Sequence, residues 1–427
     1  MTYEETIAYI HSVNWRGSRP GLSRITELLD KLGNPQKSLR CVHIAGTNGK
    51  GSTSAMLDSI LREAGYKVGL FTSPYIESFN ERIMYDGKPI ADDDLCRLVS
   101  MIAPIAEAMA DPPTEFELIT ALGFVYFKEK GCDVVVLEVG MGGRLDSTNV
   151  IEDPYLSIIT GIALDHVGFL GDTVEQIATE KAGVIKKSVP VLYGGEIPSV
   201  KEIIENTAKE KNAPFYQTDR SSLCVKKADF SGTCLDYNGM NDLFLPLLGL
   251  YQPRNLATVV TAAKILREQG LVITDSAIRE GIAKTKWKAR FEVLCEKPLF
   301  LFDGSHNMQG IDAACEAFAH YFGNEKLYLV TGVMADKAYD AMANKLVRFA
   351  KKVFAVTPDN PRALAAKDLA ALYRAKGVNA ESFNSVADAV SAALSEAKEK
   401  GYAVAALGSL YMYGEVKAAL ENNYKKK

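Results

Sequence analysis

The sequence lacks several features that mark secreted, membrane or zinc-ribbon proteins. No run reaches the roughly 18 consecutive apolar residues that a membrane helix needs. Residues 1–12 (MTYEETIAYIHS) are acidic and contain no apolar core, so they do not resemble a signal peptide. The seven cysteines are odd in number and form no CxxC pair, which argues against a zinc ribbon and favours buried, reduced thiols. We therefore expect a cytoplasmic protein with no membrane partner.

An excess of positive charge is also absent. The chain has 427 residues, with 49 Lys and Arg against 53 Asp and Glu and a formal net charge of −4. A general nucleic-acid coat needs a basic excess, so we expect no nucleic-acid partner, although a local basic groove remains compatible with these totals. Hydrophobic residues make up 47% and charged residues 24%, which is typical of a globular protein. At roughly 150 residues per domain, the length predicts two or three domains.

Short apolar runs alternate with longer segments of helical periodicity, and this alternation predicts a doubly wound α/β fold. The run CDVVVLEV is continuous, as in a parallel strand covered on both faces. Residues 215–248 differ and predict a small antiparallel patch. Strands are expected over 41–45, 68–71, 132–139, 155–160, 189–193, 299–302, 326–331, 352–356 and 402–407, and helices over 52–64, 92–110, 114–130, 173–185, 253–269 and 276–284.

A second α/β series begins near residue 291, which places a domain boundary around 286–290. We expect a P-loop-containing, doubly wound N-terminal domain over 1–289. A smaller, Rossmann-like α/β C-terminal domain is expected over 290–427. No linker rich in Gly, Ser or Pro interrupts the chain, and we find no internal repeat.

The strongest local signal is the segment GTNGKGS at residues 46–52, which follows an apolar strand and opens a helix. Glycines allow backbone N–H groups to turn toward phosphate oxygens, and a helix N-terminus adds partial positive charge. Lys50 is placed to bridge the β- and γ-phosphates, and Ser52 or Thr53 to face Mg²⁺. The spacing departs from the usual phosphate loop, because Gly51 separates the lysine from Ser52. The alternative is a glycine-rich turn that binds no ligand.

Polar residues follow three of the predicted strands. Glu138 ends the apolar run at 132–139, Ser73 follows the strand at 68–71, and His166 follows the strand at 155–160. The carboxyl ends of parallel strands are where open α/β sheets bind ligands, and oxygen ligands suit a hard cation. The alternative for the glutamate and the histidine is a purely structural role.

Several motifs together resemble one family. GTNGKGS is similar to the ATP loop of the Mur ligase superfamily, and specifically of folylpolyglutamate synthase and dihydrofolate synthase. The segment LEVGMGGRLDSTN at 137–149 resembles the second signature of that family, and DGSHN at 303–307 resembles its D-G-A-H-N-P motif. The resemblance extends from about Gly21 to Lys417. The chain departs from the family pattern at Tyr75, where a histidine is usual, at Lys288–Ala289, where Pro-Gly is usual, and at Met308, where proline is usual.

The resemblance implies a set of site residues. It places ATP binding at Asn48, Gly49, Lys50, Gly51, Ser52, Asn255, Arg290 and Asp303. It places catalytic roles at Lys50, His166, Lys181, Arg290 and His306, with Lys181 carbamylated. It implies metal ligation by Ser73, Glu138 and His166, and folate binding by Gly21, Leu22, Phe116, Glu117, Thr120, Leu145, Asp146 and Ser147. Three of these signals have a structural alternative: a helix cap for Asn255, caps for the polar groups of 111–120, and a surface ion pair for Lys181.

The implied activity is ATP-dependent addition of L-glutamate to a folate, through an acyl phosphate. The resemblance also implies ATP, Mg²⁺ at two sites, a monovalent cation as a further candidate, a reduced folate or dihydropteroate as acid substrate, and a monomer. The phosphate loop begins at Gly46, which leaves no room for the large preceding domain that peptidoglycan Mur ligases usually carry. Such a ligase, a plain P-loop ATPase or phosphotransferase, and a nucleotide-binding regulatory module are the alternatives. The motifs leave both the monofunctional and the bifunctional enzyme open.

Overall fold

The computed structural model describes residues 1–13, 17, 19–165 and 167–425, and it divides the chain into two compact units. Both units contain helices and a sheet, which confirms the α/β fold class. Within the described residues, no helix is both long enough and apolar enough to cross a membrane. Unit 1 comprises Met1–Cys224, Leu235–Phe244 and Pro253–Lys286, and unit 2 comprises Val225–Cys234, Leu245–Gln252 and Trp287–Lys427.

Unit 1 is built on an eight-stranded sheet with the order β4-β3-β2-β5-β1-β6-β7-β8. The six strands from β2 to β8 in this order are parallel, and the hairpin of β3 and β4 continues the sheet in antiparallel pairing. β1 lies between β5 and β6, so the loop that follows β1 has a strand end on each side. The strands are β1 (Cys41–Ala45), β2 (Val68–Phe71), β3 (Ile83–Tyr85), β4 (Lys88–Pro89), β5 (Val134–Glu138), β6 (Leu156–Ile159), β7 (Val191–Tyr193) and β8 (Phe215–Gln217).

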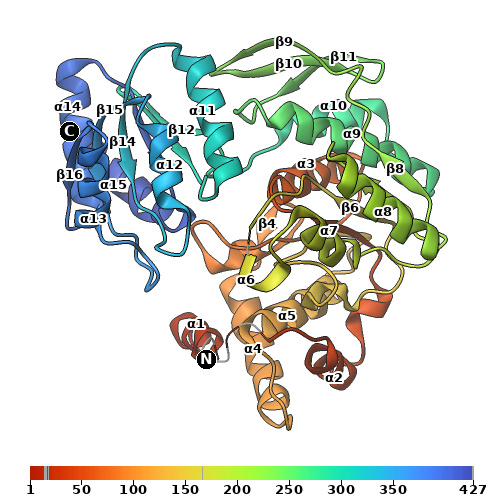
Figure 1. Cartoon of the computed structure of the whole chain (residues 1–427). Helices are drawn as coiled ribbons and strands as arrows, with labels where there is room; N and C mark the ends of the chain where they lie inside the picture. The colour runs from red at the N-terminus through yellow and green to blue at the C-terminus, as the bar shows by residue number, and fades with distance from the viewer. Residues whose placement is uncertain (14–16, 18, 166, 426–427) are drawn as a thin grey trace. The chain divides into compact units, whose positions relative to one another are not determined.

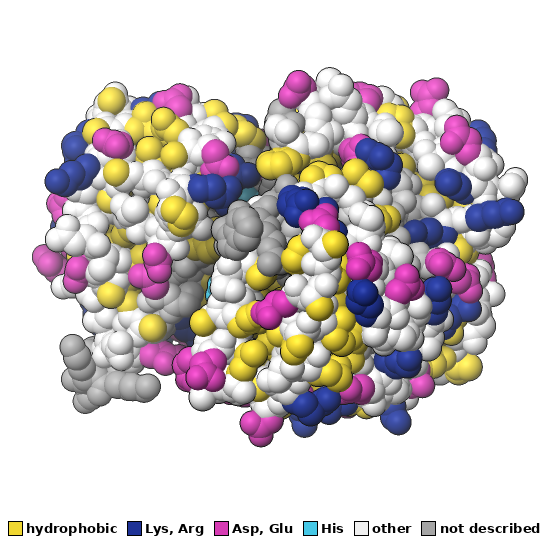
Figure 2. Space-filling model, turned by 90° about the horizontal axis from the view of Figure 1, so that it is seen from below, with side chains coloured by type: hydrophobic (Ala, Val, Ile, Leu, Met, Phe, Trp, Pro, Cys, Tyr) yellow, Lys and Arg dark blue, Asp and Glu magenta, His cyan; other side chains and the backbone are white. Residues whose placement is uncertain are grey.

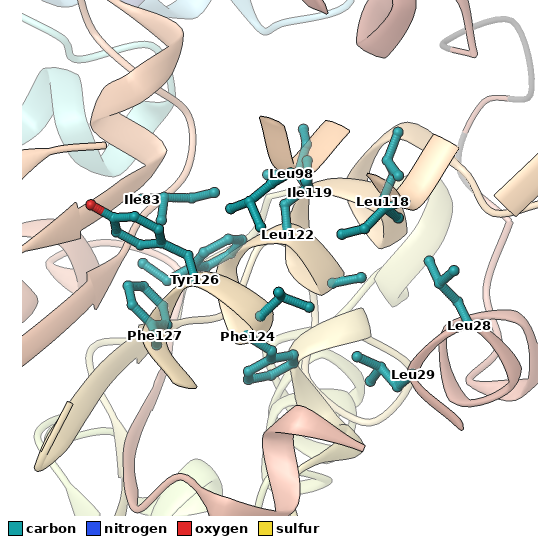
Figure 3. Packing of buried hydrophobic residues seen from close by; sticks show 14 of the residues in the cluster. Leu28, Leu29, Ile83, Leu98, Leu118, Ile119, Leu122, Phe124, Tyr126 and Phe127 are labelled. Atoms are coloured by element: carbon teal, nitrogen blue, oxygen red, sulfur yellow. The ribbon is translucent and has the colours of Figure 1, made fainter. Parts of the chain in front are cut away.

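Helices cover this sheet because each has an apolar stripe to bury. A buried cluster joins α1, α2, α4 and α5 to alternate residues of β5, among them Val135 and Leu137. Figure 3 shows α5 side chains gathered with Leu28 and Leu29 of α2 and Leu98 of α4. The helices are α1 (Tyr3–Ser12), α2 (Ser23–Lys31), α3 (Lys50–Glu63), α4 (Asp92–Glu107), α5 (Glu115–Glu129), α6 (Val167–Leu170), α7 (Val174–Ala182), α8 (Pro198–Glu210), α9 (Gln252–Glu268) and α10 (Asp275–Lys284).

A three-stranded sheet occupies most of the region for which an antiparallel patch is expected. Its order is β11-β10-β9, with β9 (Cys224–Asp229), β10 (Gly232–Tyr237) and β11 (Met240–Leu245). The expectation is wrong for the start of that region, because residues 215–217 form β8 and pair in parallel with β7 at the edge of the main sheet.

Unit 2 has a six-stranded sheet with the order β12-β13-β17-β14-β15-β16 (Figure 1). β12 is antiparallel to β13, and the other pairings are parallel. The strands are β12 (Glu292–Glu296), β13 (Leu299–Asp303), β14 (Leu327–Thr331), β15 (Ala350–Ala355), β16 (Asn379–Ser382) and β17 (Val404–Leu407). The helices are α11 (Met308–Phe322), α12 (Tyr339–Leu346), α13 (Ala366–Ala375), α14 (Val386–Lys400) and α15 (Tyr413–Lys425).

Charges of both signs are distributed over the surface. Figure 2 shows basic and acidic side chains interspersed on the face that it presents. This mixture agrees with the near balance of 49 basic and 53 acidic residues.

Candidate active site

The phosphate loop follows β1 and depends on two glycines. Gly46 has φ of +147°, and a Cβ there would lie 1.8 Å from Oγ1 of Thr160. Gly49 has φ of +87° and is the N-cap of α3, where a Cβ would lie 2.7 Å from Oδ1 of Asn255. Any larger residue at either position would collide with a neighbour in addition to adopting a strained backbone. The predicted nucleotide residue Asn255 therefore lies directly against the loop.

Residues that follow β6 form hydrogen bonds with the phosphate loop. Oγ1 of Thr160 donates to the carbonyl of Asn48 at 2.8 Å. The N–H of Thr47 donates to the carbonyl of Gly161 at 2.9 Å, and Oγ1 of Thr47 donates to the carbonyl of Ala163 at 3.1 Å. The sequence prediction did not include Thr160 among the site residues, although its position at a strand end next to glycine is a usable signal. Gly51 and Ser52 form the first turn of α3, with Ser52 buried.

Two lysines converge on one backbone carbonyl of this loop. Lys50, the first residue of α3, donates from Nζ to the carbonyls of Gly46 at 3.1 Å and Thr47 at 3.3 Å. Lys181, near the end of α7, is 4% exposed and donates to the same Gly46 carbonyl at 2.8 Å. Burial, together with the charge of Lys50, lowers the pKa of Lys181 to about 7, against the opposing effect of Asp165 and Asp146. Lys181 therefore does not form the surface ion pair that was its structural alternative.

The structure brings two of the three predicted metal ligands together. β2 and β5 are neighbours, and the N–H of Ser73 donates to Oε2 of Glu138 at 3.3 Å. Glu138 is 4% exposed. The third predicted ligand, His166, lies outside the described residues. Among the residues that are described, no three His, Cys, Asp or Glu side chains gather in a group that could hold a metal ion.

The glycine-rich loop after β5 is held by one buried carboxylate. Oδ2 of Asp146 accepts from the N–H of Met141 at 2.8 Å, and Oδ1 accepts from the N–H of Thr148 at 3.0 Å and from its hydroxyl at 2.5 Å. Burial raises the pKa of Asp146, and the hydrogen bonds from Thr148 and Met141 oppose that rise. The loop is also tightly packed, since a Cβ on Gly140 would lie 2.5 Å from the ring of Phe116. On its other side, a Cβ on Gly143 would lie 2.9 Å from the Lys181 carbonyl oxygen.

Three residues of the predicted folate group, Phe116, Glu117 and Thr120, lie in the first two turns of α5. Oε2 of Glu117 accepts from the N–H of Thr114 at 2.7 Å, from its hydroxyl at 2.9 Å and from Nε of Arg24 at 3.0 Å. Glu117 therefore caps α5 and ties it to α2, and Arg24 is a partner that the sequence prediction did not include. The hydroxyl of Thr120 donates to the carbonyl of Phe116 within the helix. Gly21 and Leu22 precede α2, while Leu145 and Ser147 flank Asp146.

Unit 2 contains a second group of predicted residues, gathered around Gly304. A Cβ on Gly304 would lie 2.5 Å from a guanidinium nitrogen of Arg290, and Nδ1 of His306 lies 2.8 Å from the Gly304 carbonyl. The carboxylate of Asp303 accepts from the N–H of Phe291 at 2.8 Å and so supports the turn that carries Arg290. Ala289, at the position where the resembled family has glycine, adopts φ of +57°. The nucleotide roles of Arg290, Asp303 and His306 stay predictions.

Comparisons with known proteins agree with this architecture. Residues 44–263 match the Mur ligase middle domain, and residues 289–410 match the glutamate ligase domain of Mur ligases. The fold and the site thus define an ATP-dependent ligase of the Mur type.

Relatives that match nearly the whole chain belong to one branch of these ligases. The chain is 37% identical to the dihydrofolate synthase/folylpolyglutamate synthase of Bacillus subtilis over 98% of its length and 99% of the relative. It is 38% identical to the folylpolyglutamate synthase of Lacticaseibacillus casei, with the same coverage. The chain belongs to the folylpolyglutamate synthase and dihydrofolate synthase family.

Solved structures show the same relationship. The folylpolyglutamate synthase of Mycobacterium tuberculosis, complexed with ADP and AMPPCP, superposes with a TM-score of 0.88 at 30% identity, covering 100% of this chain and 99% of that one. The folylpolyglutamate synthase of Thermotoga maritima gives a TM-score of 0.86 at 32% identity, covering 99% and 97%.

Proposed function

We propose that this chain uses ATP to join the α-amine of L-glutamate to a carboxylate of a folate, with dihydropteroate as a further acid substrate. The observation that carries the proposal is the convergence of Lys50 and Lys181 on the Gly46 carbonyl, inside a phosphate loop that Asn255 and Thr160 brace. The ammonium of Lys50, together with the N–H groups of a turn that opens a helix, creates a preference for an anionic ligand, and Lys181 lies at the same carbonyl.

The proposed reaction proceeds in two steps. A carboxylate oxygen of the acid substrate attacks the γ-phosphorus of ATP, which forms an acyl phosphate and releases ADP. The glutamate amine then attacks the acyl carbon, and the tetrahedral intermediate collapses to an amide and inorganic phosphate. The N–H groups of the phosphate loop and the ammonium of Lys50 hold the phosphates in position and stabilise the charge on them. Lys50 must exchange its present carbonyl partners, Gly46 and Thr47, for phosphate oxygens.

The strand ends beside the loop fit a magnesium ion. Ser73 and Glu138 offer a hydroxyl and a carboxylate oxygen, the hard donors that Mg²⁺ prefers, and the hydrogen bond from the Ser73 backbone N–H to Glu138 supports this assignment because it brings the two residues together. Ser73 and Glu138 would hold the ion, together with His166. When bound, Mg²⁺ would neutralise charge on the phosphoryl group being transferred.

Lys181 is proposed to carry a carbamate in the active enzyme. Only a neutral amine adds CO₂, and a lysine whose pKa is lowered to about 7 is substantially neutral near neutral pH. The product is an anion. A carbamate on Lys181 would attract the ammonium of Lys50, whereas two ammonium groups repel each other. The packing of Gly143 against the backbone at Lys181 fixes the helix end that carries this side chain.

The proposal is tested by measuring ADP release with and without L-glutamate. The acid acceptors are dihydropteroate, tetrahydrofolate and a UDP-sugar peptide. We expect glutamate-dependent ADP release with one or both pterin acids and not with the peptide. Lys50→Ala should lower this rate by about 10²–10³-fold, as for the loss of a preorganised charge-stabilising donor, while the exposed Lys187→Ala serves as the matched control.

Each other outcome identifies a different function. Release that is indifferent to glutamate indicates an ATPase or phosphotransferase, and release with the peptide alone indicates a peptidoglycan-type ligase. ATP binding without any turnover indicates a regulatory module. Any of these three results contradicts the proposal.

A further inference from the structure

A line of three buried side chains connects the strand of the phosphate loop to the glycine-rich loop. His43 lies in the middle of β1, and its Nε2 is 2.8 Å from Oγ1 of Thr148. That hydroxyl is 2.5 Å from Oδ1 of Asp146. His43 and Thr148 are 0% exposed and Asp146 is 6% exposed. No role in the proposed reaction accounts for a histidine at this position.

The hydrogen-bond directions along this line follow from the donor inventory. Asp146 already accepts the backbone N–H groups of Met141 and Thr148, and these donors favour its ionised form. The Thr148 hydroxyl has one hydrogen, which it donates to Asp146, so its oxygen accepts from His43. Nδ1 of His43 has no hydrogen-bond partner among the described residues. Because a buried N–H without an acceptor costs more free energy than a buried lone pair, the proton is on Nε2 and Nδ1 is unprotonated. Burial lowers the pKa of His43 to about 3, so the ring stays neutral.

The carboxylate at the end of this line fixes the shape of the glycine-rich loop. Asp146 binds back to Met141 and thereby closes the loop on itself. The closed loop has Phe116 on one side, against Gly140, and the backbone of α7 on the other, where the N–H of Arg144 donates to the Glu180 carbonyl at 2.8 Å. Without the Thr148 hydroxyl, the carboxylate would keep its two backbone N–H donors but lose its shortest hydrogen bond, which would hold the loop less firmly between these two neighbours.

We propose that His43 is a positioning residue for the ligase reaction: by donating to Thr148 it fixes Asp146, and through Asp146 the glycine-rich loop against which the acid substrate binds. This inference rests on the proposed function, because it takes the loop beside Phe116 as part of the acid-substrate site. In this proposal His43 touches neither substrate and acts only through Thr148 and Asp146.

Two substitutions at His43 separate the hydrogen bond from the packing. The amide nitrogen of glutamine can occupy the place of Nε2, whereas asparagine is shorter by one methylene and cannot reach Thr148. His43→Asn should therefore raise the KM for the pterin acid by about tenfold, the equivalent of one hydrogen bond, and leave the KM for ATP nearly unchanged. His43→Gln should stay close to the wild-type values. A purely structural role would lower the melting temperature and the activity without separating the two KM values.

A second pair of variants tests the middle of the line. Thr148→Val keeps the shape and removes the hydroxyl, and Thr148→Ser keeps the hydroxyl. We expect the valine variant to reproduce the KM change of His43→Asn and the serine variant to restore nearly normal binding. The double variant His43→Asn with Thr148→Val should be no worse than Thr148→Val alone, since both changes interrupt one line. This second pair decides the matter if the histidine variants do not fold.

Several results would overturn the inference. Equal KM values for His43→Asn and His43→Gln would do so, as would an unchanged KM in Thr148→Val or additive effects in the double variant. A wild-type chain with no glutamate-dependent ADP release overturns both the proposed function and this role. An active wild-type chain in which the variant pattern is absent overturns only the role of His43.

Discussion

Lys50 and Lys181 donate to the same atom, the carbonyl oxygen of Gly46, at 3.1 Å and 2.8 Å. One carbonyl acceptor does not neutralise two ammonium groups, so the charge of Lys50 raises the free-energy cost of charging Lys181. Burial adds to this cost for Lys181, and the two effects together lower its pKa to about 7. The convergence of these two lysines on one carbonyl favours an anionic ligand at this site.

The first prediction concerns stability in buffer free of CO₂. In the unfolded chain Lys181 has a pKa near 10.5, and in the folded chain near 7, so between these values the folded state binds fewer protons. The free energy of unfolding should therefore rise with pH above 7, by about 1.4 kcal/mol for each pH unit. Urea unfolding at pH 7, 8 and 9 should show a steeper rise in the wild type and in Lys187→Met than in Lys181→Met, which keeps the contribution of Lys186, whose pKa burial lowers to about 8. Equal slopes in all three would contradict it.

The second prediction concerns the carbamate. Lys181→Ala should lose most of its ADP release, because the variant cannot present an anion at this position. A short carboxylic acid such as acetate should restore part of the activity, since it can supply two oxygens in the vacated space. The same acid should not help Lys50→Ala, which provides the control. Isotope-labelled CO₂ should give a carbamate signal in the wild type, and its absence under active conditions would reject the modification.

The third prediction concerns magnesium. Glu138→Gln preserves the shape of the side chain and removes its charge, so we expect the Mg²⁺ concentration for half-maximal activity to rise by at least about tenfold. The exposed Glu202→Gln should titrate as the wild type does. A wild-type Mg²⁺ titration for Glu138→Gln would place the ion elsewhere.

The fourth prediction separates a structural from a binding role for Glu117. Its carboxylate is 2% exposed and pairs with the buried guanidinium of Arg24, so Glu117→Gln should lower the free energy of unfolding by about 3 kcal/mol. Glu115→Gln, which loses only a half-exposed contact with His11, should change it by less than about 1 kcal/mol. A stable Glu117→Gln variant with a raised KM for the acid substrate would instead assign the residue to substrate binding.

The sequence predicts the buried parallel strands well. The expected ranges 41–45 and 68–71 coincide with β1 and β2, because a strand covered on both faces must be apolar along its whole length. Edge strands carry no such signal. β16 has one buried residue among four, Ala380, so its residues show no apolar run from which a strand could be predicted. The start of α3 at Lys50, two residues before the expected range, depends on the left-handed conformation of Gly49.

The candidate site shows a similar division. The sequence identifies the loops, since glycine, lysine and carboxylate residues directly after apolar runs are typical of the ligand-binding edge of an α/β sheet. It does not identify the partners that hold those loops, because these come from distant segments. Thr160 and Asn255 contact the phosphate loop, and Arg24 forms a hydrogen bond with Glu117, which lies 93 positions further along the chain. Such contacts depend on the order of the strands in the sheet, which a local pattern of residues does not determine.

The central place of β1 in its sheet also affects the order of assembly during translation. β1 leaves the ribosome early, yet its neighbours are β5 (Val134–Glu138) and β6 (Leu156–Ile159), and its loop is completed by Asn255 on α9. A nascent chain that ends before Pro253 has every residue of the phosphate loop without the side chain that rests on Gly49. Pairings between distant segments form slowly, because loop closure must precede them. Nucleotide affinity should therefore emerge only when nearly all of unit 1 has been synthesised, which makes ATP a ligand that reports completion of this unit.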